Sequence, residues 1–92
     1  MRLEFSKSAL KFLRKLDKNK ERALKQKVSL LYETVSELKE IPFNQLDIKQ
    51  LKGDWQGYYR MRVGQIRVIF DIRWQEDVLY IHRISYRGGA YD

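Results

Sequence analysis

The spacing of apolar residues changes once along this chain, at Gly57. Before Gly57 the apolar residues recur about every 3.6 positions, as in helices that bury one stripe. After it they recur at about every second position, as in strands that bury one face. Helices and strands that occupy separate parts of a sequence are typical of an α+β fold. This change therefore predicts a helical part followed by an antiparallel sheet.

The first predicted helix covers roughly residues 7–16. It begins after Ser6, whose hydroxyl can accept a hydrogen bond from a backbone N–H group of the first turn. Its apolar residues follow helical spacing on one stripe: Ala9, Phe12, Leu13 and Leu16. Basic residues occupy most of the remaining surface. Such a face is either ordinary solvated surface or a docking surface for structured RNA.

A longer second helix is predicted over about residues 20–39, with Asp17 or Asn19 as its N-cap. Pro42 ends it, because the residue before a proline is pushed out of helical conformation. Its apolar stripe advances by four and three residues in turn: Leu24, Val28, Leu31, Val35 and Leu38. This stripe could form the seam of a coiled-coil dimer. Because it spans only about two and a half heptads, packing of the helical pair against a sheet is the favoured interpretation.

Strands are predicted on both sides of the helices. Leu3 and Phe5 alternate with polar neighbours as in a short first strand, and residues 43–56 are expected to form a connection. The later strands cover Tyr58–Val63, Ile66–Trp74 and Asp77–Ser85, with turns at Gly64-Gln65 and near Gln75-Glu76. The predicted fold is therefore α+β with the order β-α-α-β-β-β. It is a helical hairpin packed on a small antiparallel twisted sheet, in a single domain over residues 1–92.

The charge of the chain indicates an anionic partner. The 92 residues include 19 Lys and Arg against 12 Asp and Glu, which gives a formal net charge of +7. A nucleic acid, an acidic protein segment, or both would suit such a domain. Residues 58–92 hold six Arg and no Lys. Because guanidinium groups grip phosphate or carboxylate at two points, the strand region is the part expected to hold the anion.

Composition also limits the cellular compartments in which this protein is expected. The chain has no cysteine, which excludes disulfides, thiolate metal sites and cysteine nucleophiles. Its apolar runs are far shorter than the ~20 residues that a membrane span needs. The sequence shows no secretory signal before its first alternating segment. We therefore expect a cytoplasmic protein that makes no contact with a membrane.

The first hairpin carries the sharpest local anomaly. A tight turn there would place Arg62 directly opposite Arg67 on the polar face, with Arg60 two residues away on the same side. Like charges that face each other across a sheet cost up to about 1 kcal/mol unless an anion lies between them. This pattern predicts a phosphate-binding surface. Alternatively, the arginines extend into solvent or form ion pairs with Asp71 and Asp54.

The last residues of the chain are candidates for the same surface. Gly88 and Gly89 are costly to order, so Arg87 and Tyr91 around them suggest that this segment folds back for a purpose. Arginines near Tyr91 would favour its phenolate form, which could then accept a proton. Alternatively, Tyr91 is an amphipathic residue that caps the core.

The sequence lacks several common catalytic patterns. It has no paired carboxylates at motif spacing, no Ser-His-Asp pattern and no glycine-rich phosphate loop, and His82 is its one histidine. No metal ion or cofactor is therefore expected. Arginines around a phosphate and one weak base suffice for RNA cleavage in which the 2'-hydroxyl attacks the adjacent phosphorus, because fixed charges stabilise the transition state. His82 is either an acid or base in this reaction or a packed strand residue.

Three segments resemble the RelE/ParE superfamily, the toxins of type II toxin–antitoxin pairs in bacteria and archaea: Leu51–Gly53, Tyr59–Phe70 and Arg83–Tyr91. The resemblance extends over essentially the whole chain. It implies a growth-arresting toxin that a cognate antitoxin holds inactive in a hetero-oligomer. In the RelE branch, the toxin enters the ribosomal A site beside ribosomal RNA and cuts mRNA by 2'-hydroxyl attack. In the ParE branch, a similar fold poisons DNA gyrase and lacks the nuclease residues.

The resemblance also assigns roles to individual residues. Its catalytic positions fall on Arg60, Arg62, Arg67, Arg87 and Tyr91, and the substrate-binding candidates are Lys52, His82 and Arg83. The later basic residue of the family pattern falls on Arg87 or Arg83. The register of the last hairpin leaves open whether Arg83 or His82 points toward the site. Retention of Arg67, Arg87 and Tyr91 favours a RelE-like ribonuclease over a ParE-like gyrase poison.

Overall fold

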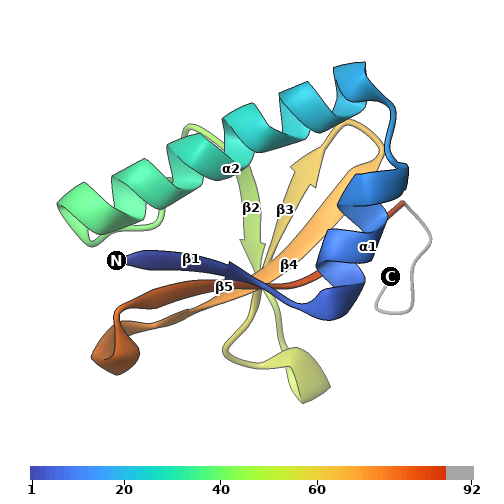
Figure 1. The fold of residues 1–92 in the computed structure, drawn as a ribbon. Helices are drawn as coiled ribbons and strands as arrows, with labels where there is room; N and C mark the ends of the chain where they lie inside the picture. The colour runs from blue at the N-terminus through green and yellow to red at the C-terminus, as the bar shows by residue number, and fades with distance from the viewer. Residues whose placement is uncertain (87–92) are drawn as a thin grey trace.

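A computed structural model describes residues 1–86 and contains two helices and a five-stranded sheet (Figure 1). The helices are α1 (Lys7–Lys15) and α2 (Lys18–Leu38), and the strands are β1 (Arg2–Phe5), β2 (Asp47–Gln50), β3 (Tyr59–Val63), β4 (Ile66–Arg73) and β5 (Val78–Tyr86). The strand order is β1-β5-β4-β3-β2. The α+β class and the predicted element order are confirmed. The sheet is mixed and not wholly antiparallel as predicted, because β1 pairs with β5 in parallel, whereas the other pairs are antiparallel.

Side-chain caps fix where both helices begin. Ser6 Oγ accepts a hydrogen bond from the backbone N–H of Ala9 at 3.1 Å and thereby caps α1, as predicted. Of the two candidate caps for α2, Asp17 takes the position and accepts from the N–H of Lys20 at 3.0 Å. Each cap satisfies a backbone donor that the first turn leaves without a helical partner. Short polar residues therefore account for the sharp bend between the helices.

The apolar stripe of α2 packs against the sheet. Its buried residues are Leu24, Val28, Leu31 and Val35. They share one core with residues of the three central strands, including Met61, Val68, Phe70 and Leu79. Leu38, at the end of the stripe, stays 62% exposed. This packing confirms the helical pair on a sheet, because the face that a coiled-coil partner would need is already covered.

The first hairpin has the predicted register. Val63 pairs with Ile66, and Arg62 stands opposite Arg67. Gly64 opens the turn with φ of +61°, a backbone conformation that glycine adopts without the steric cost of a Cβ atom. The chain therefore reverses within two residues, and both arginines are fixed on neighbouring strands.

An additional strand lies within residues 43–56, which the sequence analysis took for a connection. Residues Asp47–Gln50 form β2 and pair with β3 at the edge of the sheet. The flanking Leu46 and Ile48 are buried in the core. Their burial drives this segment onto the sheet, so Asp47 between them is turned to the opposite face. The predicted fold is thus extended by one edge strand.

The hairpin between β4 and β5 contains a bulge. Ile69 pairs with Arg83, whereas the next residue, Phe70, pairs with Ile81. His82 is therefore the extra residue on β5, and the bulge resolves the register that the sequence left open. Strand β4 ends at Arg73, one residue before the predicted end, because the chain turns in a short 3-10 helix over Trp74–Glu76.

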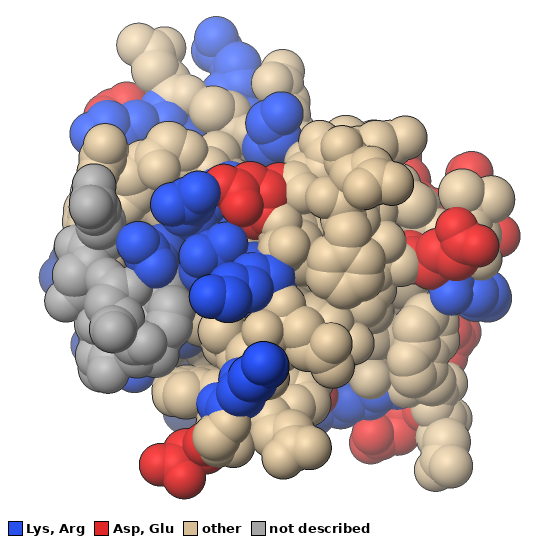
Figure 2. Space-filling model, turned by 180° about the vertical axis from the view of Figure 1, so that it is seen from behind, with Lys and Arg blue, Asp and Glu red and all other residues tan. Residues whose placement is uncertain are grey.

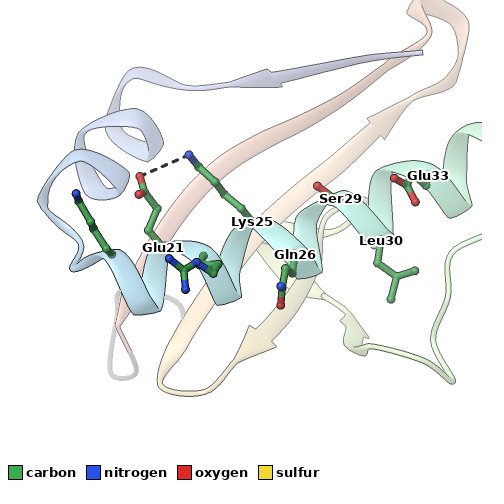
Figure 3. Close-up of a pocket in the computed structure, with 8 residues that line it drawn as sticks. Glu21, Lys25, Gln26, Ser29, Leu30 and Glu33 are labelled. Carbon is green, nitrogen blue, oxygen red and sulfur yellow. Dashed lines mark ion pairs between the residues drawn. The ribbon is translucent and has the colours of Figure 1, made fainter.

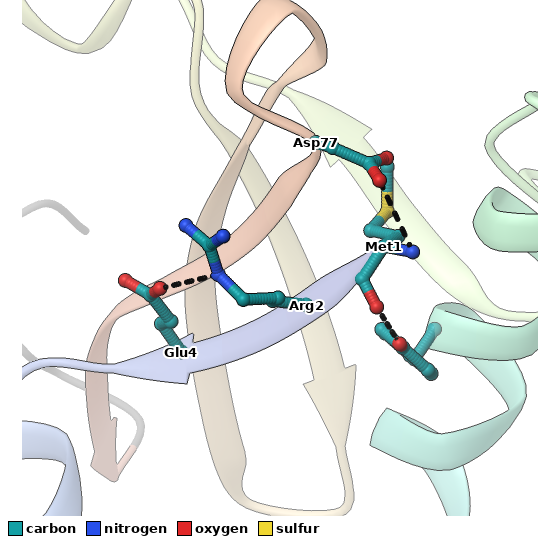
Figure 4. Close-up of polar contacts among 5 residues, drawn as sticks. Met1, Arg2, Glu4 and Asp77 are labelled. Atoms are coloured by element: carbon teal, nitrogen blue, oxygen red, sulfur yellow. Dashed lines mark hydrogen bonds and ion pairs between the residues drawn. The ribbon is translucent and has the colours of Figure 1, made fainter.

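Polar contacts attach β1 to its surroundings (Figure 4). The amino group of Met1 lies 3.3 Å from a carboxylate oxygen of Asp77, just before β5. The hydroxyl of Tyr32, on α2, donates a hydrogen bond to the carbonyl oxygen of Met1. On the exposed side of β1, Arg2 forms an ion pair with Glu4 at 3.1 Å. These contacts hold β1 between α2 and the start of β5. None of the helices within residues 1–86 is long and apolar enough to cross a membrane.

Candidate functional site

Three arginines of the first hairpin lie on the sheet face opposite the helices. Met61 and Val68 point into the core, so Arg60, Arg62 and Arg67, which alternate with them along the strands, point the other way. Figure 2 shows basic side chains gathered on the side of the molecule seen from behind, next to an acidic patch. The alternation of the strands thus brings these three predicted residues together.

A cleft of about 320 Å³ opens at the turn end of this face. Its lining consists of Asp47, Arg62, Gly64, Gln65 and Arg67. The two opposed guanidinium groups form its charged walls, and the glycine leaves the turn side open. A phosphate group bound between two arginines gains charge-assisted hydrogen bonds and also relieves their mutual repulsion. The shape and charge of the cleft therefore suit a phosphate.

Asp47 is the carboxylate partner of two of these arginines. Arg60 Nη2 donates to Asp47 Oδ1 at 3.2 Å, and Arg62 Nε donates to Asp47 Oδ2 at 2.8 Å. The expected alternative partner, Asp71, instead accepts a hydrogen bond from Arg73 at 3.2 Å. The carboxylate that pairs with Arg60 and Arg62 stands on β2, a strand that the sequence analysis did not anticipate. Among the described residues that line the cleft, two are arginines and one is an aspartate, so this part of the lining is positively charged.

Arg60 lies deeper in this group than Arg62, whose side chain is 48% exposed. The side chain of Arg60 is only 12% exposed. Its Nε is buried and has no hydrogen-bond partner within residues 1–86. A buried guanidinium donor without a partner is costly, and a bound anion could satisfy it. Arg60 therefore adds positive charge next to the cleft, whereas Arg62 and Arg67 line it.

The remaining sequence candidates lie around the cleft. Arg83 is exposed and pairs with Ile69, which makes it a diagonal neighbour of Arg67 on the adjacent strand. His82 packs in an aromatic cluster, with its ring 5.6 Å from that of Trp55 and 5.4 Å from that of Tyr58. Within the described residues, His82 does not line the cleft. Of the two β5 candidates, the bulge thus leaves Arg83, and not His82, on the same face as the arginines and diagonal to Arg67.

Lys52 is exposed and precedes the 3-10 turn at Gly53–Trp55; it is not among the described residues that line the cleft. Arg87 and Tyr91 lie outside the described residues. Asp47, in the lining of the cleft, was missed by the sequence analysis. The alternation of Leu46, Asp47 and Ile48 could have revealed it, because two buried apolar residues around a polar one are typical of a strand.

Arg73, at the end of β4, has a pKa that its surroundings shift. The hydrogen bond from Arg73 to Asp71 raises the pKa of that guanidinium above its usual value. The guanidinium also lies 4.3 Å from the centre of the Tyr80 ring. Arg73 thus remains charged but is engaged at the end of the sheet away from the cleft. Within residues 1–86, no cluster of His, Asp or Glu side chains is arranged to hold a metal ion.

The outer surface of α2 has a different character from the arginine face. A shallow hollow there is lined by acidic and basic side chains alike, and Glu21 forms an ion pair with Lys25 at 3.7 Å (Figure 3). Glu33 and the exposed Leu30 extend the hollow along the helix. Because acidic and basic groups alternate here, the surface offers no continuous positive field for a nucleic acid. This favours the simple solvated interpretation of this helix face.

Comparisons with known proteins agree on the class. The sequence model of the family described as the ParE toxin of the type II toxin-antitoxin system, parDE, matches residues 3–91. The RelE1 toxin of Methanocaldococcus jannaschii is 34% identical over 89 residues, which span 97% of this chain and 92% of that protein. A chain of the archaeal RelE-RelB complex from Pyrococcus horikoshii is 31% identical, with a TM-score of 0.73 and 97% of both chains covered. The isolated RelE toxin of E. coli shares the fold, at 21% identity and a TM-score of 0.73, over 97% of this chain and 86% of that one.

The fold and the family match together define a toxin of a type II toxin–antitoxin system. The chain belongs to the ParE toxin family, within the RelE/ParE superfamily that the sequence resembles. The relatives from Methanocaldococcus and Pyrococcus, both above 30% identity, carry the name RelE, which supports the RelE-like branch.

Proposed function

We propose that this toxin is an endoribonuclease that cuts mRNA on the ribosome. The observation that carries the proposal is the cleft in which Arg62 and Arg67 face each other across the first hairpin. In the proposed reaction, these two groups hold the scissile phosphate. Arg60 adds positive charge next to it, while Asp47 fixes the directions of Arg60 and Arg62. Such fixed donors stabilise a transition state without reorganising during the reaction.

The reaction needs no group beyond the substrate and the side chains. The 2'-oxygen of one nucleotide forms a bond to its neighbouring phosphorus, and the bond from phosphorus to the 5'-oxygen of the next nucleotide breaks. The 2'-hydroxyl loses its proton to a base, and the leaving 5'-oxygen gains one. The products are a 2',3'-cyclic phosphate and a 5'-hydroxyl. Tyr91 is our candidate for the proton acceptor, and Arg87 for a further phosphate ligand.

We propose two kinds of partner for this chain. One is a cognate antitoxin that inhibits it in a hetero-oligomer, a proposal supported by the complex of the Pyrococcus relative with RelB. The other is the ribosomal A site with its mRNA and ribosomal RNA, a proposal supported by the net charge of +7. Both partners would meet the toxin in the cytoplasm.

A second candidate function follows from the family match. That family is named for ParE toxins, so a gyrase poison without nuclease activity is the alternative. The two functions leave different traces in cells. A ribonuclease produces new 5' ends in transcripts, whereas a gyrase poison triggers DNA damage signalling and leaves mRNA intact.

Removal of one cleft arginine tests the proposal. We expect induction of the wild-type toxin to arrest growth and to create new transcript 5' ends. Arg67→Ala should lower cleavage by about 10²-fold or more, the loss typical when one transition-state donor is removed. Arg22→Ala, which removes the same charge from the exposed surface of α2, is the matched control and should stay fully toxic. Both variants should keep the circular dichroism spectrum and melting temperature of a folded domain.

Three outcomes would contradict the assignment. Full cleavage by soluble Arg67→Ala would remove the cleft from the mechanism. Growth arrest with intact transcripts and an induced DNA damage response would favour the gyrase alternative. Equal loss of toxicity in Arg22→Ala would show that overall charge, rather than the cleft, matters.

A further inference from the structure

A second basic hollow, which we call the α1–β5 groove, lies between α1 and the end of β5. It has a volume of about 350 Å³. Its charged lining consists of Lys11, Lys15 and Arg83, and its remaining polar side chains are those of Ser8, Ser85 and Tyr86. Within the described residues, no acidic side chain lines this groove. It is therefore a cationic hollow in which no described carboxylate competes for the bound group.

The course of β1 explains why the groove exists. Strand β1 pairs with β5 only as far as Phe5 opposite Ile81. The chain then turns at Ser6, whose hydroxyl donates to the carbonyl oxygen of His82 at 2.7 Å, and enters α1. Beyond Ile81, no described strand pairs with this edge of β5. The open edge and the basic side of α1 form the two walls of the groove.

The groove continues from the arginine cleft across two neighbouring strands. Ser85, in its wall, is the direct register partner of Arg67, in the wall of the cleft. The diagonal neighbour of Arg67 is Arg83, whose side chain also belongs to the groove. Arg67 and its β5 neighbours therefore form a continuous positive track from one hollow to the other.

A hydroxyl group in the wall of the groove is available for a ligand. Ser85 Oγ is buried and makes no hydrogen bond within residues 1–86. A hydroxyl in this position can donate to a phosphate or sugar oxygen. At the rim, Tyr86 is 46% exposed, and its ring rests 5.1 Å from that of Phe12. These features supply hydrogen-bonding and apolar contacts beside the three cations, the combination found in grooves that follow single-stranded nucleic acids.

We propose that the α1–β5 groove binds the sugar–phosphate backbone of the same single-stranded RNA whose scissile phosphate lies in the arginine cleft. The inference rests on the proposed function and deepens it. The groove holds nucleotides next to the cut, and Lys11 and Lys15 contact their phosphates. RNA long enough to reach both hollows is therefore bound more tightly than RNA that fills only the cleft.

Binding of uncleavable RNA tests this inference separately from catalysis. The probes are fluorescent 2'-O-methyl RNAs of about twelve and about three nucleotides, followed by anisotropy over a range of KCl concentrations. The test variant is Lys11→Gln/Lys15→Gln. The control is Lys27→Gln/Lys39→Gln, which makes the same charge change at exposed positions on α2 and at its end.

We expect the test variant to bind the longer RNA about tenfold more weakly. The slope of log affinity against log salt should become shallower by about 1.4, because two phosphate contacts are lost. The shorter RNA should bind to the test variant as to the wild type, and the control should change neither value. Weaker binding of the longer RNA with this salt signature would support the groove.

The possible failures are distinguishable. Unchanged affinity in the test variant, with weaker binding in Arg67→Ala, would overturn the groove and leave the proposed function intact. Equal losses in test and control variants would also overturn it. If the test variant lost affinity for an oligoglutamate peptide but not for RNA, the groove would be a protein-binding site instead. Groove-dependent binding in a toxin that leaves natural mRNA uncut on the ribosome would refute the proposed cleavage and retain the groove.

Discussion

At the scale of single residues, Asp47 determines how the arginine face is arranged. It holds both Arg60 and Arg62 on β3, whereas Arg67 faces them from β4. A single carboxylate can direct two guanidinium groups without neutralising the whole cluster. The cleft is therefore preorganised for an anion, and Asp47 is the acidic residue among the described part of its wall, so it repels that anion.

Replacement of Asp47 by Asn should tighten RNA binding. The neutral amide removes a negative charge from the cleft wall, so we expect affinity for 2'-O-methyl RNA to rise about threefold to tenfold and to depend more steeply on salt. Because exposed ion pairs contribute little, the free energy of unfolding should fall by no more than about 1 kcal/mol. Anisotropy and urea denaturation measure the two effects.

Glu33→Gln, which makes the same charge change on the outer surface of α2, separates local from global electrostatics. It should leave RNA affinity nearly unchanged. Weaker binding in Asp47→Asn would mean that its positioning of the arginines outweighs its repulsion of the phosphate.

At the scale of elements, the stripe of α2 holds the layer of helices on the sheet. Leu31 is fully buried in the core, whereas its neighbour Leu30 is 36% exposed on the outer surface. Both residues are leucines in the same helix, so replacing each by alanine changes helix propensity equally. A difference between the two variants therefore reports the effect of burial. The sheet that positions the arginines depends on the buried member of this pair.

We therefore expect Leu31→Ala to lower the free energy of unfolding by about 2–5 kcal/mol, because it removes buried contacts and leaves a cavity. Leu30→Ala should cost about 0.5 kcal/mol or less, as surface substitutions do. Equilibrium urea denaturation of both variants measures the difference. Similar losses in the two variants would be inconsistent with the stripe packing described.

The elements also show what the sequence could and could not predict. The caps and stripes of both helices were foreseeable because they depend on local spacing, and the first hairpin because its glycine turn fixes the register. The four-residue β2 is too short to stand out, and its stability comes from pairing with β3. The bulge at His82 shows in the sequence only as a change of phase, because the buried residues of β5 step by three from Ile81 to Ile84 instead of by two. Asp47 was missed for the same reason as β2.

At the scale of the whole molecule, the two faces of the sheet differ in what they contact. One face carries the helices and the core, and the other presents the arginines to solvent. A small domain can therefore remain stable while one face of its sheet is left for a substrate. Because the cleft and the groove adjoin on neighbouring strands, the molecule offers a continuous track for an extended anionic chain.

The central claim is that this surface cuts RNA through the attack of a 2'-hydroxyl. The most direct measurement uses purified toxin and ribosomes that hold a defined mRNA in the A site, with the products mapped by primer extension. The account predicts that the all-RNA message is cut and that its upstream fragment ends in a 2',3'-cyclic phosphate. A message with one 2'-deoxynucleotide just before the cut position should stay intact there. Equal cutting of the two messages, or of neither, would contradict it.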